Sequence, residues 1–64
     1  MIDEKVMKQR SVALVIAMVG KEAASLWWSS KNKAFDMKTP TEVWLKEPER
    51  VYLYLMDHAS GDYL

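Results

Sequence analysis

The 64-residue sequence contains no cysteine and only one histidine. Disulfide bonds and thiolate metal sites are therefore excluded, and a metal site built on histidine ligands is disfavoured. An excess of charge is also missing, because nine Lys and Arg residues balance nine Asp and Glu residues. A nucleic-acid-binding module normally carries a basic excess on at least one face, so this balance argues against one.

Long hydrophobic runs are missing as well. The longest uninterrupted apolar segment runs only from Val12 to Val19, whereas a membrane-spanning helix needs about 20 apolar residues. Basic residues precede this run, as they do in a signal peptide. The acidic residues Asp3 and Glu4, however, reduce the positive charge that the start of a signal peptide normally carries. We therefore expect a cytoplasmic protein without a membrane segment.

What the chain has in quantity is apolar surface. Half of its residues are hydrophobic, including three Trp and five Met, yet a chain of this length buries only about 60% of its unfolded surface. Association is then the natural route to stability, through a homodimer or an obligate partner. Since the segment 12–19 is apolar on every side of a helix, a second molecule is expected to cover it. The predicted self-association residues are Val12, Val15, Ile16 and Val19.

The clearest local signal lies at residues 39–42. Thr39 can cap a helix, Pro40 suits the first helical position because its missing N–H needs no partner there, and Glu42 completes a capping box. A short helix is expected from Pro40 to about residue 46. Its predicted inward-facing residues are Val43, Trp44 and, as a third candidate, Leu45.

Three further helices are expected around this one. Asp3 is a candidate N-cap for a helix that runs to Val19, where Gly20 is expected to end it in the left-handed conformation. The second runs over about residues 21–29, and the last starts at Pro48 and ends at 60–61. Because four residues of 12–19 are β-branched, a buried strand there is the alternative.

The loop between the second and third helices is mostly polar and holds the only Phe of the chain. Asn32 is the residue best suited to an Asx turn or a left-handed conformation. Phe35 is expected to fill the gap between the helix pairs. The sequence therefore predicts a single all-α domain of about four helices, residues 1–64, that forms a dimer.

Catalytic groups do not form a convincing set. Asp57 and His58 are adjacent, so they diverge on a helix, and no Ser or Cys is placed to act as a nucleophile with them. Among the carboxylates at 36, 42, 47 and 49, two are explained by capping and helix ends. Paired-carboxylate catalysis also needs a cleft that so small a chain scarcely provides. We predict a protein that is not an enzyme, with no catalytic, cofactor-binding or metal-binding residues.

Aromatic side chains are the other candidates for function, because they dominate the hot spots of protein interfaces. Core packing is the favoured role for Trp27 and Trp44. For Trp28 and Tyr54 both roles stay open, since each faces away from the main apolar stripe of its helix. An exposed Trp on so small a protein would indicate a binding surface.

Residues 12–64 resemble the toxin-binding domain of the Xre/MbcA/ParS-type bacterial antitoxins, here as a stand-alone domain without the usual helix-turn-helix region. The likeness rests on an apolar helix, a helix with a Trp, a polar turn with Asn, a Thr-Pro helix start and a last helix that ends in Gly. In this sequence the segments are AASLW (23–27), NKAF (32–35), KTPTEVW (38–44) and ERVY (49–52) through Gly61. Met37 stands where the family commonly has Gly, which matters if this position needs a positive φ.

The resemblance implies an all-α, dimeric, non-enzymatic antitoxin that binds and inhibits a RES-type toxin, which consumes NAD. It also implies that the C-terminal segment reaches into the entrance of the toxin's active site, where a free carboxylate can occupy a basic nucleotide pocket. Trp27, Asn32, Phe35, Thr39 and Pro40 would then be structural. The predicted partner-binding residues are Trp28, Tyr54, Gly61, Asp62, Tyr63 and Leu64.

Two other functions remain open. The first is a helical adaptor or inhibitor, of phage or host origin, that binds some other bacterial protein with the same fold. The second is a small DNA-binding regulator whose recognition helix starts at Pro40 and exposes Lys38, Thr41 and Lys46. Those are few basic residues for phosphate contact.

Overall fold

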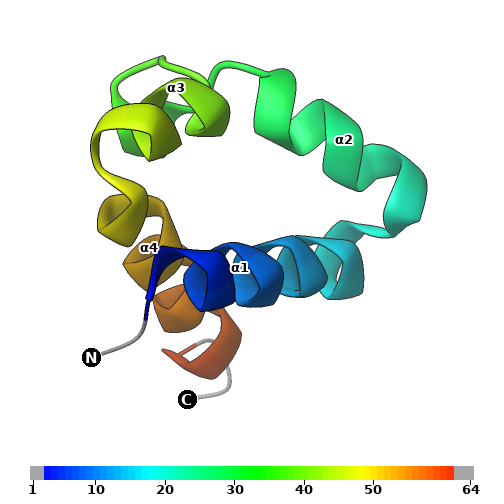
Figure 1. The fold of residues 1–64 in the computed structure, drawn as a ribbon. Coiled ribbons are helices and arrows are strands. Elements are labelled where there is room, and N and C mark those ends of the chain that lie inside the picture. The colour runs from blue at the N-terminus through cyan, green and yellow to red at the C-terminus, as the bar shows by residue number, and fades with distance from the viewer. Residues whose placement is uncertain (1–2, 62–64) are drawn as a thin grey trace.

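The computed structural model describes residues 3–61 and contains four α-helices there: α1 (Glu4–Val19), α2 (Lys21–Ser29), α3 (Pro40–Lys46) and α4 (Pro48–Gly61). A single 3₁₀ turn, η1 (Lys33–Phe35), lies between α2 and α3. The all-α fold of about four helices is confirmed (Figure 1). Residues 12–19 are helical, so the alternative of a buried strand is wrong.

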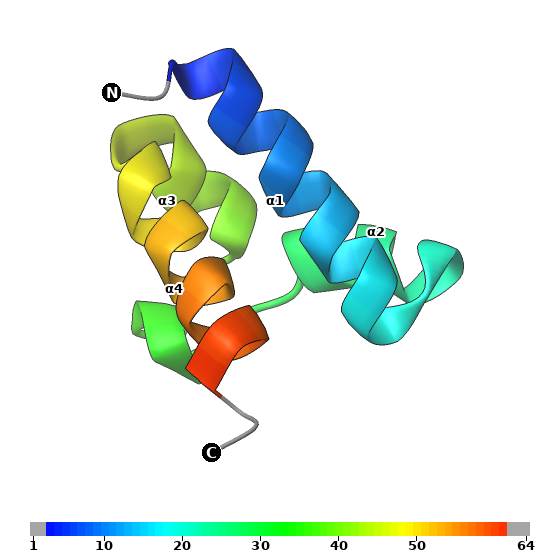
Figure 2. The same ribbon diagram turned by 90° about the horizontal axis from the view of Figure 1, so that it is seen from below.

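The four helices follow one another around a common core. α1 packs against α2 and α4, and α3 packs against the same two helices from the other side. Figure 2 shows α3 and α4 next to each other on one side, with α1 running past them toward α2. The buried core receives residues from every helix and from η1: Met7, Val15, Ala24, Phe35, Val43, Trp44, Val51, Tyr52 and Leu55.

Helix α1 begins and ends at the predicted residues, but the conformation of Gly20 at its end differs from the prediction. The Asp3 carboxylate accepts a hydrogen bond from the N–H of Val6 at 3.0 Å, which confirms the cap. Gly20 has a φ of 92° and a ψ of 162°, so it is extended and not left-handed helical. Essentially only Gly adopts this region. The φ is positive, as the left-handed prediction requires, but the ψ lies outside the left-handed helical region, so the predicted left-handed helical cap is wrong.

Gly20 serves both neighbouring helices. Its N–H donates to the carbonyl of Ile16 at 2.8 Å, and its own carbonyl accepts from the N–H of Ala24 at 3.0 Å. The chain therefore turns from α1 into α2 at one residue, with a bend of 117°. In the described part of the chain, neither of these helices nor any other is by itself long and apolar enough to span a membrane.

The start of α3 is held by the predicted capping box. The N–H of Glu42 donates to Thr39 Oγ1 at 3.1 Å, and the N–H of Thr39 donates to Glu42 Oε1 at 2.8 Å. The hydrogen bonds from the Thr39 backbone and side chain stabilise the carboxylate and lower the pKa of Glu42 below its ordinary value. Val43 and Trp44 are buried as expected, but Leu45 is 80% exposed, so its predicted inward orientation is wrong.

The loop before α3 folds onto Asn32. The Asn32 side-chain oxygen accepts from the N–H of Ala34 at 2.9 Å, which confirms an Asx turn. The backbone carbonyl of Asn32 accepts from the N–H groups of Phe35 (3.0 Å) and Met37 (2.9 Å). Phe35 is thereby driven into the core, where only 1% of its surface is exposed. The positive φ values fall on Asp36 (57°) and Met37 (65°), not on Asn32.

Candidate functional site

A chain of aromatic rings crosses the core from α2 to α4. Ring centroids are separated by 5.1 Å between Trp27 and Trp28, 6.4 Å between Trp27 and Phe35, and 5.0 Å between Phe35 and Tyr54. Trp28 also lies 6.0 Å from the buried Trp44. Trp28 and Tyr54 are therefore half-buried against core rings, which supports a packing role for both, and their role in partner binding stays a prediction. Trp27 is half-buried as well.

The groups considered for catalysis stay apart from one another. The exposed ring of His58 is tilted by 40° against the ring of Tyr54, with the ring centroids 4.2 Å apart. The His58 Nδ1 lies 3.2 Å from the backbone carbonyl oxygen of Tyr54. Over residues 3–61, no three His, Asp or Glu side chains come together as metal ligands would. Of the carboxylates considered, Glu42 and Glu47 line one hollow beside α3, which is described below.

An open groove lies between α1 and α2, and we name it the α1–α2 groove. Its volume is about 360 Å³. Its lining residues are Lys8, Val12, Ile16, Lys21, Ala24, Ser25, Trp28 and Thr41. On α1 these residues recur every four positions, at 8, 12 and 16, which is the spacing that places side chains along one helical face.

Trp28 is the largest side chain of this groove, and α1 and α3 both contact it. The Lys8 ammonium lies 5.7 Å from the Trp28 ring centroid and 5.3 Å from that of Trp44, within cation–π range. The Thr41 hydroxyl donates to the carbonyl of Trp28 at 2.8 Å and so ties α3 to the end of α2. The Trp28 indole N–H is buried and has no acceptor among the described residues.

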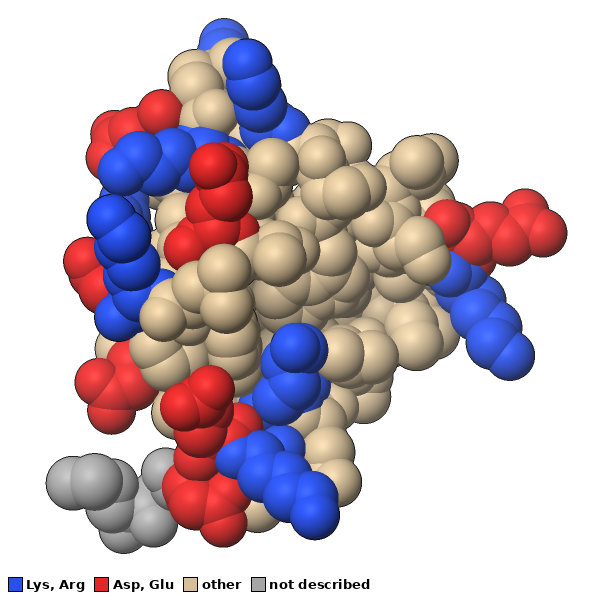
Figure 3. All heavy atoms as spheres, turned by 45° about the horizontal axis from the view of Figure 1, so that its top comes forward, with Lys and Arg blue, Asp and Glu red and all other residues tan. Residues whose placement is uncertain are grey.

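The surface around the groove carries unusual apolar exposure for a small protein. Ile16, Met18 and Val19 are each more than a third exposed, on the last two turns of α1. Figure 3 shows a broad uncharged area on one face, with the charged side chains lying mostly toward its edges. Ile16 and Val19 share one side of α1, and exposed apolar surface of this kind is a candidate for contact with another molecule.

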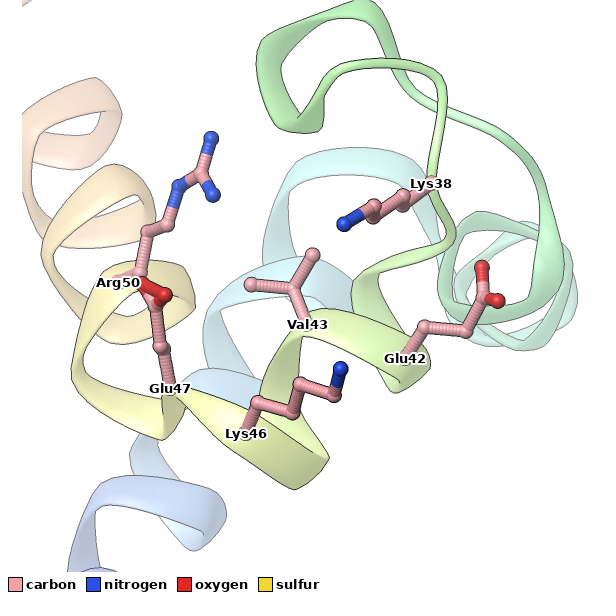
Figure 4. Close-up of a pocket in the computed structure, with 6 residues that line it drawn as sticks. All are labelled: Lys38, Glu42, Val43, Lys46, Glu47 and Arg50. Carbon is pink, nitrogen blue, oxygen red and sulfur yellow. The ribbon is translucent and has the colours of Figure 1, made fainter.

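A smaller, polar hollow of about 170 Å³ lies beside α3 (Figure 4). The ammonium groups of Lys38 and Lys46 point over Val43 in this hollow. Two of its other charges have partners within the fold: Glu42 completes the capping box, and Arg50 lies 3.4 Å from the Asp36 carboxylate. Glu47 lines the hollow as well. These contacts give the hollow a structural role in joining the loop, α3 and α4.

The predicted self-association residues divide into two groups. Val15 is fully buried in the core of a single chain, so the prediction that it contacts a second copy is wrong. Val12 is half-buried, and Ile16 and Val19 are exposed. For these three residues self-association stays a prediction.

The predicted partner-binding residues are only partly visible. Trp28 lines the α1–α2 groove, Tyr54 does not, and Gly61 is the last residue of α4. Asp62, Tyr63 and Leu64 lie outside the described residues. Sequence reasoning missed Lys8, Lys21 and Thr41 as lining residues, although the four-residue spacing of Lys8, Val12 and Ile16 was a signal for the first.

Comparison with known proteins gives no matching family model, no matching curated protein and no matching solved structure. The resemblance to the antitoxin domain therefore stays a prediction from the sequence.

Proposed function

We propose that this chain is a non-enzymatic protein-binding module of the antitoxin type, which binds and inhibits a RES-type toxin in the cytoplasm. The observation that carries the protein-binding part is the α1–α2 groove, an apolar depression with a half-buried Trp28 and exposed Ile16 on its walls. Aromatic residues in such partly desolvated positions are the usual anchors of protein interfaces.

The toxin as partner rests on the sequence resemblance, and the loop geometry supports it. Met37 stands where the family commonly has Gly, and it adopts a φ of 65°, a value that Gly adopts without strain. The loop thus keeps a backbone suited to the family's residue even though the residue differs. The capping box at Thr39 and Glu42 supports the same reading, although such boxes are common.

Inhibition of NAD consumption tests this function. Purified RES-type toxins of the source genome are mixed with increasing amounts of the protein, and the loss of NAD is followed. We expect one of them to lose activity in proportion to the protein added, up to a fixed stoichiometry. Unchanged NAD consumption by all of them, at excess protein, would contradict the antitoxin function.

Two matched variants locate the binding surface in the same assay. Ile16→Glu places a charge in the groove, where Ile16 is 37% exposed, and is expected to abolish inhibition. Leu26→Glu places the same charge on α2 outside the groove lining, where Leu26 is 66% exposed. This control is expected to inhibit like the original chain, and equal loss in both variants would argue against the groove.

The adaptor function uses the same groove and differs only in the partner. It is supported over the antitoxin function if the purified protein retains a different bacterial protein, if Ile16→Glu loses that protein, and if no RES-type toxin is inhibited. The DNA-binding function gains no support from α3, because the Thr41 hydroxyl already donates to Trp28 and Glu42 adds negative charge beside Lys38 and Lys46.

A further inference from the structure

The charged side chains that line the α1–α2 groove are of one sign. Lys8 and Lys21 are the only charged side chains that line it, and no carboxylate does. Neither lysine forms an ion pair with another residue of the described part of the chain, where the one ion pair joins Arg50 to Asp36. In a protein whose total charge is zero, the lining of this groove therefore carries two positive charges and no negative one.

The two lysines lie at opposite ends of the groove. Lys21 is the first residue of α2, next to the turn at Gly20, whereas the Lys8 ammonium lies against Trp28 near the other end of that helix. Seven residues of an α-helix separate positions 21 and 28, which corresponds to about 10 Å along the helix axis. An apolar strip of about this length thus has a cation at each end.

The walls between the lysines offer a peptide backbone few hydrogen-bonding side chains, namely the hydroxyls of Ser25 and Thr41. Val12, Ile16, Ala24 and Trp28 present apolar atoms, and α1 and α2 use their own backbone groups within the helices. The Thr41 hydroxyl already donates to Trp28. Since a buried backbone group needs a hydrogen-bond partner, an occupant that satisfies its own backbone, as a helix does, fits this groove better than an extended strand.

We propose that the α1–α2 groove binds an amphipathic helix of a partner protein, with carboxylates about two helical turns apart that pair with Lys8 and Lys21. Large apolar side chains between those carboxylates contact Ile16 and Trp28. Positions seven residues apart on a helix are about 10 Å apart, which matches the spacing of the lysines. This inference shares the α1–α2 groove and the need for a protein partner with the proposed function, and it does not depend on that partner being a toxin.

A second copy of this chain is the competing occupant, because Val12 and Ile16 are also predicted self-association residues. A twofold dimer brings the same patch of each copy together. Across this groove the facing patches would both be positive, and like charges at an interface oppose association. The charge of the groove therefore favours an acidic partner helix over a second copy.

Synthetic helical peptides test the inference directly. One Ala-based peptide carries a Leu stripe with Glu at two positions seven residues apart, and its matched control has Gln at both positions. Each is titrated into the full chain labelled with nitrogen-15, and the backbone and indole N–H signals are followed. We expect the Glu peptide to bind about tenfold more tightly, with shifts at Ile16, Ala24 and the Trp28 indole. The difference between the peptides should nearly vanish at about 1 M salt.

Charge exchange sharpens this result. In Lys8→Glu/Lys21→Glu the preference should reverse, so that a third peptide with Lys at both positions binds about tenfold better than the Glu peptide. The control Lys33→Glu/Lys46→Glu changes the net charge equally at exposed sites outside the groove and should keep the preference for Glu. Thermal unfolding of each variant checks that the fold is retained.

Three outcomes overturn the inference: equal affinity for all peptides, shifts that lie away from the groove, and a dimer in sedimentation that Ile16→Glu dissociates. Its failure can be distinguished from failure of the proposed function. If a toxin is inhibited equally well by Lys8→Glu/Lys21→Glu, the antitoxin function stands and this inference falls. If the acidic peptide binds in the groove and no toxin is inhibited, this inference stands and the antitoxin function falls.

Discussion

The α1–α2 corner and the segment that includes η1 and α3 solve the same problem, a change of chain direction, in opposite ways. The segment from Asn32 to Glu42 is fixed by side-chain caps at both Asn32 and Thr39 and by several backbone hydrogen bonds around one buried Phe. At the corner, Gly20 has no side-chain cap, and beyond Gly20 and its two chain neighbours no atom lies within 4 Å of the place where a Cβ would stand.

The two regions also differ in whether their apolar side chains are buried or exposed. Polar side chains fix the loop that joins α2 to α3, and Phe35 then anchors the rings of Trp27 and Tyr54. The corner instead leaves apolar side chains at the surface, with Ile16, Met18 and Val19 exposed beside the groove. The loop segment thus adds a buried anchor to the core, whereas the corner leaves exposed apolar surface that we propose a partner covers.

The largest expected effect comes from removing the anchor of the loop. Phe35→Ala should cost about 3–5 kcal/mol, because it deletes a fully buried ring and leaves a cavity. In a domain this small, that loss should leave the chain largely unfolded. Circular dichroism and urea unfolding measure it.

The matched control for this substitution is Leu26→Ala, whose side chain is 66% exposed on α2. It should change the free energy of unfolding by no more than about 0.5 kcal/mol. Equal costs for the two substitutions would mean that the core is not centred on Phe35.

The next effect concerns the cap of α3. Thr39→Ala removes the acceptor for the N–H of Glu42 and should cost about 1 kcal/mol of unfolding free energy. Thr39→Ser keeps a hydroxyl in place and should cost much less. Urea unfolding of the three proteins measures the order, and an Ala variant as stable as the Ser variant would show that the cap contributes nothing.

The parts of this fold that depend on neighbours in the chain could be predicted from the sequence. Asp3, Thr39, Pro40 and Pro48 begin their helices at the expected residues because a cap or a proline acts within one turn. Phe35 was predictable as a core residue because a lone Phe in a polar loop needs burial.

The parts that depend on packing over long distances were not predictable. Trp28 and Tyr54 lie toward the core because Trp44 and Phe35 receive them, which the apolar stripe of each separate helix does not reveal. The groove itself depends on the bend at Gly20, since only that bend sets Ile16 of α1 beside Trp28 of α2. The positive φ of Asp36 had no Gly to signal it, and that of Met37 was indicated only by the Gly that the resembled family commonly has at this position.

Met37 therefore offers a smaller test within the rigid segment. Its φ of 65° is unfavourable for a residue with a Cβ, and its side chain is exposed. Met37→Gly should raise the free energy of unfolding by up to about 1 kcal/mol, whereas Met18→Gly, inside α1, should lower it by about the same amount. A Met37→Gly variant that is destabilised in thermal unfolding would contradict a strained loop.

The smallest effect is a pH dependence confined to the same segment. Hydrogen bonds from Thr39 lower the pKa of Glu42 in the folded protein below its ordinary value of 4.5. The unfolded chain therefore binds a proton at Glu42 more readily than the folded chain does. The stability that Glu42 contributes is complete above about pH 4.5 and is lost as the pH falls through the lower, folded pKa.

The variant Glu42→Gln tests this dependence, because it keeps an oxygen acceptor and removes the titration. The free energy of unfolding of the variant should fall less steeply over that acidic range than that of the original chain. Urea midpoints measured from about pH 7 down to about pH 3 give both slopes, and the other carboxylates cancel in the difference between them. Parallel curves would mean that the capping box holds α3 equally well with a protonated Glu42, and the rigidity of this segment would then rest on Phe35 and the loop hydrogen bonds alone.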